Sequence, residues 1–211
     1  MTEDFSIVLP REVPRNPVPC ISHGGDCGAC AIAGVTGLTP KEAYKFHFPG
    51  TYLGGKAQKK ESPVSVSHMA ESLVATGRVE HIIEGMINMT SMDYAPPEWG
   101  AFGPLPHYQA VLYFNLFRAL LSAGYYRLCT VSSGGSGFSG QMKQQTNHWI
   151  MINGIRGHLE PVMSFPDAKK YEYEIRISDS ANSRPHCVWV DIGEFLQCWG
   201  GMVGVWAKPK K

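Results

Sequence analysis

Three residues that could share the work of nucleophilic catalysis lie far apart in this chain of 211 residues: Cys27, His148 and Asp179. Cys27 stands where a glycine-containing loop gives way to a run of small residues typical of a buried helix. A thiol at a helix start lies beside the positive end of the helix dipole and beside free backbone N–H groups, which favour the reactive thiolate. His148 and Asp179 each lie at the end of an apolar segment. Cysteine, histidine and aspartate in this arrangement are what a cysteine hydrolase needs.

Neither His148 nor Asp179 is a specific signal by itself. A histidine at the end of a strand is most often solvated, and an aspartate before a Ser-Ala-Asn-Ser sequence is most often a turn residue. If the two strands pair, however, both polar groups lie at one edge of a sheet, and the helix that carries Cys27 can face them. The three residues together therefore favour a catalytic site.

The surrounding elements predict the fold class. Residues 1–20 contain several prolines and predict an extended arm, residues 21–207 a single domain, and residues 208–211 a solvated basic tail. Apolar periodicity and capping residues predict helices at 27–36, 39–48, 65–77, 106–123 and 193–199. β-branched and aromatic content predicts strands at 78–84, 125–131, 149–155, 171–178, 187–190 and 202–207. Helices come first and strands mostly later, so we expect an α+β fold in which an antiparallel sheet packs against a helical half.

Composition restricts the partners. The net charge is +1, which gives no reason to expect nucleic acid or an anionic membrane as a partner. No apolar run approaches the roughly 20 residues of a membrane-spanning helix. The six cysteines show no spacing typical of a disulfide scaffold, and the first residues do not resemble a signal peptide, so we expect reduced thiols and a cytoplasmic location. The expected partner is a peptide or protein substrate, with no cofactor and no metal; the oligomeric state is not predicted.

The segment around Cys27 carries a family resemblance. Residues 26–37 read Asp-Cys-Gly-Ala-Cys-Ala-Ile-Ala-Gly-Val-Thr-Gly, with Glu42-Ala43 following. This resembles the nucleophile segment of the bacteriocin-processing, or double-glycine leader, peptidases of the papain superfamily. His148-Trp149 and the segment at 177–181 resemble that family's histidine and aspartate segments. The resemblance covers about residues 20–207 and implies a papain-like fold, in which an N-terminal helical half carries the nucleophile.

The same resemblance implies the roles of the site residues. Cys27 would be the nucleophile, His148 the general base and acid, and Asp179 the group that orients the imidazole. The family also uses a glutamine about six residues before the cysteine to bind the oxyanion, but position 21 here is isoleucine. Ser22 and His23 are the candidates that could replace it, beside the backbone N–H of Cys27. Because the family's glutamine is absent at position 21, both hydrolysis and acyl transfer to another amine remain possible reactions.

Several alternatives remain open on sequence alone. Cys30 shares a helix face with Cys27 and is an alternative nucleophile. Cys27-Gly28-Ala29-Cys30 also resembles the Cys-x-x-Cys motif of a thiol–disulfide oxidoreductase, although a loop rather than a buried strand precedes it. A zinc site from Cys27, Cys30 and a histidine, or a non-catalytic binding protein on the same fold, are further possibilities. The remaining histidines, among them His47 and His186, show no motif and are expected at the surface.

Overall fold

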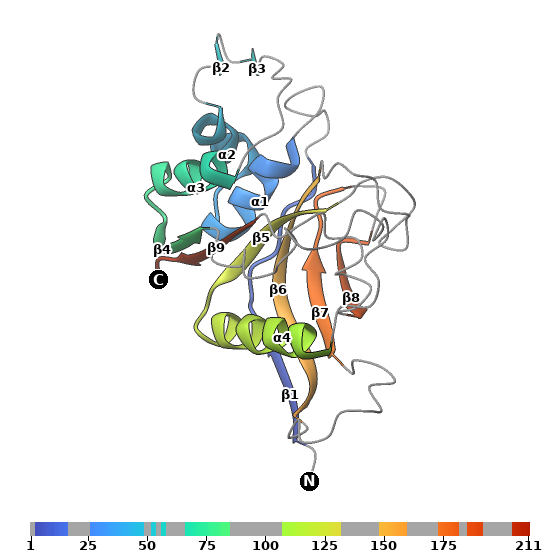
Figure 1. Ribbon diagram of the computed structural model, residues 1–211. Coiled ribbons are helices and arrows are strands. Elements are labelled where there is room, and N and C mark those ends of the chain that lie inside the picture. Colours follow the sequence, from blue (N-terminus) through green and yellow to red (C-terminus); the bar gives the residue numbers. More distant parts are fainter. Residues whose placement is uncertain are drawn as a thin grey trace, which may run out of the picture.

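One antiparallel sheet organises the protein, with the long strand β6 (His148–Leu159) near its centre (Figure 1). The computed structural model describes residues 3–16, 26–48, 52–53, 56–57, 66–84, 107–131, 148–159, 173–181, 185–191 and 204–211. Within these residues the sheet has seven strands in the order β4-β9-β5-β6-β7-β8, and β1 also pairs with β6. The expected α+β class with an antiparallel sheet is confirmed.

The element bounds follow the predicted order closely. The other strands of the sheet are β1 (Glu3–Val8), β4 (Val79–Glu84), β5 (Tyr126–Val131), β7 (Tyr173–Ser178), β8 (Cys187–Asp191) and β9 (Gly204–Pro209). The helices are α1 (Asp26–Thr36), α2 (Pro40–His47), α3 (Val66–Ala75) and α4 (His107–Ser122). A separate two-stranded pair, β2 (Tyr52–Leu53) and β3 (Lys56–Ala57), lies between α2 and α3 in the chain.

Strand β6 is long enough to pair with two strands along one edge. Its first half pairs with β5 and its second half pairs with β1, so β1 takes the place of β5 as the neighbour of β6 along the second half. Asn153 stands at the junction, where the ladder to β7 on the other edge also shifts register. Its carbonyl accepts the N–H of Leu9, and its buried side-chain amide donates to the carbonyl of Arg11, both at 2.8 Å. The junction thereby attaches the arm after β1 to the centre of the sheet.

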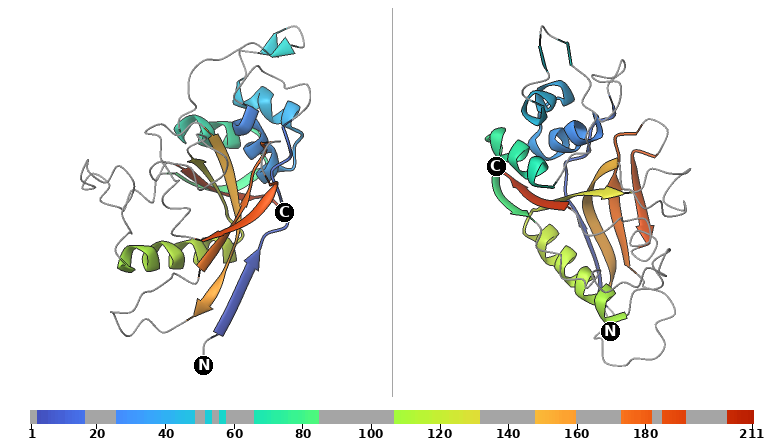
Figure 2. Two further views of the ribbon diagram at one scale, coloured as in Figure 1. Left: turned by 90° about the vertical axis from the view of Figure 1, so that its right-hand side faces the viewer. Right: turned by 45° about the horizontal axis from the view of Figure 1, so that its top comes forward.

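Alternating side chains divide the core into two layers, one on each face of the sheet. Helices α1, α2 and α3 cover one face, and α4 covers the other (Figure 2). The first layer receives the strand residues Tyr126, Leu128, Trp149, Met151, Val205 and Ala207. The second receives Cys129, Ile150, Ile152, Ile175, Ile177 and Trp206. The strand side chains alternate between the two faces with a period of two residues. The small residues of α1 pack against the strand residues of the first layer.

Local sequence signals set the helix ends. Thr39 caps α2 in a capping box: the backbone N–H of Glu42 donates to its hydroxyl, and the Glu42 carboxylate accepts the backbone N–H of Thr39. Gly124, with φ of 85°, follows α4 in the left-handed region that glycine adopts most easily. None of the helices among the described residues is both long and apolar enough to cross a membrane.

The predicted arm and the predicted tail differ from the structure, and one predicted helix is not tested by it. The sequence predicts an extended arm over residues 1–20, but its first residues form strand β1 and belong to the sheet, because they pair with the half of β6 that β5 does not reach. The basic tail predicted from residue 208 begins inside β9, where Lys208 lies opposite His81 of β4. The helix predicted at 193–199 lies outside the described residues.

Candidate active site

The first turn of α1 places Cys27 at the surface of an otherwise buried helix. Every other residue of α1 is buried, while Cys27 is partly exposed. The helix is made of glycine, alanine and other small residues, so it lies close against the sheet and against α2. Cys27 therefore combines solvent access with the N-terminal end of a helix, the two features that a reactive thiol needs.

The close approach of His47 to α1 explains why a glycine follows Cys27. A Cβ atom on Gly28 would lie 2.5 Å from Nε2 of His47, closer than two such atoms can approach. His47 at the end of α2 is fully buried, contrary to the expectation that it lies at the surface. Its Nδ1 donates to Ser72 Oγ on α3 at 3.0 Å, because the Ser72 hydroxyl itself donates to the carbonyl of His68. No sequence motif marks His47; only its position at the end of a capped amphipathic helix hints that it faces the core.

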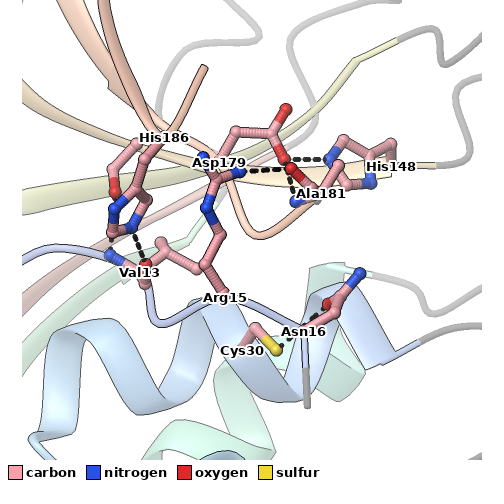
Figure 3. Close-up of polar contacts among 9 residues, drawn as sticks. Val13, Arg15, Asn16, Cys30, His148, Asp179, Ala181 and His186 are labelled. Atoms are coloured by element: carbon pink, nitrogen blue, oxygen red, sulfur yellow. Dashed lines mark hydrogen bonds and ion pairs between the residues drawn. The ribbon is translucent and has the colours of Figure 1, made fainter. Parts of the chain in front are cut away.

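His148 and Asp179 meet at the edge of the sheet. Strands β6 and β7 pair, and Nε2 of His148 lies 2.6 Å from Oδ1 of Asp179 (Figure 3). Only 11% of the His148 side chain and 1% of the Asp179 side chain is exposed. Oδ1 of Asp179 also accepts the backbone N–H of Ala181 at 2.8 Å, and the backbone N–H of Asp179 donates to the carbonyl of His186 at 2.8 Å. The carboxylate is thus held in one orientation toward the imidazole.

Cys27 is a second partner of the same imidazole. Burial by itself lowers the pKa of His148, but hydrogen bonds to Asp179 and Cys27, together with the negative charges of these two groups, outweigh it and raise the pKa to about 9. Since Nε2 is occupied by Asp179, Nδ1 is the ring nitrogen available to the thiol. A histidine with this pKa is protonated at neutral pH and therefore holds a proton that it can donate beside Cys27.

Cys30 occupies a different environment one turn further along the helix. It is fully buried, and its thiol donates to Oδ1 of Asn16 at 3.3 Å. Asn16 belongs to the arm, and Figure 3 shows it between Cys30 and the segment that carries Asp179. A buried thiol cannot meet a peptide carbonyl, so the burial favours Cys27 over Cys30 as the nucleophile.

The arm after β1 supports the Asp179 segment from one side. The backbone N–H of Val13 donates to Ser178 Oγ at 2.8 Å, and that of Asn16 donates to the carbonyl of Ser180 at 2.9 Å. The guanidinium of Arg15 donates to the carbonyl of Ala181. The arm therefore contacts both neighbours of Asp179 along the chain, a role that its proline content alone did not reveal.

The predicted oxyanion donors lie outside the described residues, since Ser22 and His23 fall between the arm and α1. The structure thus brings together Cys27, His148 and Asp179. No model of a known protein family matches the chain, and no curated protein sequence matches it either.

Proposed function

We propose that this chain is a papain-like cysteine peptidase or amidohydrolase, similar to the bacteriocin-processing peptidases that its Cys27 segment resembles. The observation that carries the proposal is the imidazole of His148, held at 2.6 Å by a buried carboxylate and in contact with Cys27. A structural histidine needs no such charge on both sides, whereas a thiol hydrolase needs the thiolate, the imidazolium and the group that orients it.

The reaction follows from this geometry. The Cys27 thiolate attacks the carbonyl carbon of a peptide or amide bond, and protonated His148 gives its proton to the leaving amine as the C–N bond breaks. The acyl group is then held as a thioester on Cys27. His148, now neutral, removes a proton from water, which attacks the thioester and releases the acid and the thiolate. A second amine in place of water would give acyl transfer by the same steps.

The main alternative is a thiol–disulfide oxidoreductase that uses Cys27 and Cys30. That reaction has no step that requires a buried aspartate bonded to the neighbouring histidine, so the His148–Asp179 pair favours the hydrolase. The four cysteines within the described residues are free thiols, which supports a reducing, cytoplasmic setting as part of the proposal.

Trapping the thioester tests the proposal. The full chain is incubated with a library of short peptides and amides, and products and intact protein mass are measured together. We expect amide cleavage by the native chain and a transient acyl adduct on Cys27, with neither in Cys27→Ser and both retained in Cys30→Ser. Disulfide exchange activity that is lost in both single variants, with no amide cleavage, would instead establish the oxidoreductase.

A further inference from the structure

A second cluster of chemically active side chains lies beside the Asp179 segment. Glu12 of the arm meets His186 and Cys187, which precede and begin β8, and one donor atom of each lies within 4.8 Å of the others. Cys187 pairs with Ser178 across β7 and β8. Among the described residues, no other group of three or more histidine, cysteine and acidic side chains comes this close together.

We propose that Glu12, His186 and Cys187 form a binding site for one Zn²⁺ ion, which links the N-terminal arm to strand β8. The proposal does not depend on the hydrolase activity, because none of the three residues belongs to the Cys27–His148–Asp179 group.

The ligand types select the metal. A thiolate, an imidazole and a carboxylate are three ligands that zinc accepts together, usually with water at a fourth, tetrahedral position. Calcium and magnesium require oxygen ligands and disfavour the thiolate. Zinc–ligand bonds of roughly 2.0–2.3 Å need donors somewhat closer than 4.8 Å, a difference that rotation of the Cys187 and exposed Glu12 side chains can close.

The imidazole of His186 is already prepared as a ligand. Its Nε2 is bonded to the carbonyl oxygen of Val13, so Nε2 carries the proton and Nδ1 presents its lone pair (Figure 3). Metal-bound histidines commonly donate their second N–H to a backbone carbonyl in this way, which fixes the ring and its tautomer. The carbonyl here belongs to the residue directly after Glu12, so the same arm supplies a ligand and the carbonyl that orients the histidine.

The Cys187 thiol and the Glu12 carboxylate already lie close together. The thiol of Cys187 contacts the Glu12 carboxylate and Ser178. On binding, the thiol proton leaves to solvent and the sulfur gives an electron pair to Zn²⁺. Arg176 pairs with Oε1 of Glu12, which leaves the second carboxylate oxygen for the metal.

The test uses the Cys27→Ser chain, because the Cys27–His148 pair is itself able to hold zinc. Titration calorimetry with Zn²⁺ on the reduced protein should give one ion per chain, and Co²⁺ should give the charge-transfer absorption of a cobalt–thiolate bond. Cys187→Ser and His186→Gln in that background should weaken zinc binding by more than about 100-fold, because removing a group that only hydrogen-bonds to a metal ligand can already cost that much. The cobalt–thiolate band should vanish in Cys187→Ser.

Two further variants serve as controls. Arg176→Gln removes a positive charge beside the site and should bind zinc at least as tightly. Glu12→Gln, at an exposed position, should weaken binding and keeps the test decisive if changes at His186 or Cys187 prevent folding. Absence of binding in the Cys27→Ser chain, or unchanged binding in Cys187→Ser and Glu12→Gln, would overturn the proposal.

Discussion

His148 and Asp179 are joined by a single hydrogen bond of 2.6 Å, and the same carboxylate oxygen also accepts the backbone N–H of Ala181 at 2.8 Å. The aspartate is therefore oriented by its own loop before it orients the imidazole. Because the backbone of Ala181 fixes the carboxylate, an aspartate in an ordinary turn sequence can orient a histidine that lies 31 positions away in the chain.

Replacing Asp179 with asparagine tests the charge separately from the hydrogen bond. Asp179→Asn keeps an oxygen that can accept from His148 but removes the negative charge, so we expect the pKa of His148 to fall. Amide cleavage at neutral pH should then decrease by roughly 10²–10⁴-fold, the upper figure being that of triad carboxylates in other hydrolases. The measurement is kcat/KM against pH, with circular dichroism as the control for folding. Turnover equal to the native chain would reduce Asp179 to a turn residue and make Asn182 the next candidate.

The raised pKa of His148 also predicts how stability depends on pH. The folded state holds the imidazole proton more tightly than the unfolded state, so this stabilisation is complete below about pH 6.5 and is lost as the pH rises through about 9. We expect the free energy of unfolding in urea to decrease across that window in the native chain. His148→Gln should show a clearly smaller decrease, and equal slopes in the two proteins would mean that His148 is not the group responsible.

Gly28 and His47 provide a test of how the helix start is positioned. Gly28→Ala places a Cβ 2.5 Å from the His47 ring, so we expect a loss of about 1–3 kcal/mol in the free energy of unfolding, typical of overpacking. Alkylation of Cys27 should also slow, because α1 must move. The matched control is the same change in a His47→Ala background, where the space is open. If Gly28→Ala costs as much there, the contact with His47 is not the cause.

Cys30→Ser separates the two thiols of the Cys27 segment. The Cys30 side chain is buried and bonded to Asn16, so serine should preserve most amide cleavage at some cost in stability. Cys27→Ser should abolish cleavage. Loss of cleavage in Cys30→Ser while the protein remains folded would show that Cys30 takes part in the reaction.

The sequence predicts the elements well because their signals are local. The capping box at Thr39, the glycine after α4 and the β-branched strands each depend on neighbours within a few residues. The approach of His148 to Asp179 could also be anticipated, since it requires only that two adjacent strands pair.

Contacts between distant segments could not be anticipated in this way. The burial of His47 depends on how α2 packs against α1 and α3, and no residue near His47 in the sequence indicates this packing. The cluster of Glu12 with His186 and Cys187 requires the arm to lie beside β8, although the two segments are more than 170 positions apart in the chain. Only the folded arrangement brings such groups together.

The most direct test of the central claim is the rate at which each cysteine is alkylated in the folded chain. A limiting amount of iodoacetamide is added at neutral pH, and the modified sites are mapped by mass spectrometry in the native chain and in His148→Gln. Burial raises the pKa of Cys129 to about 12 and also raises that of Cys187, so both should remain slow. We predict that Cys27 reacts much faster than Cys30, Cys129, Cys187 and Cys198, and that His148→Gln removes this advantage. Equal rates at all cysteines, or an unchanged Cys27 rate in His148→Gln, would contradict a Cys27–His148–Asp179 catalytic site.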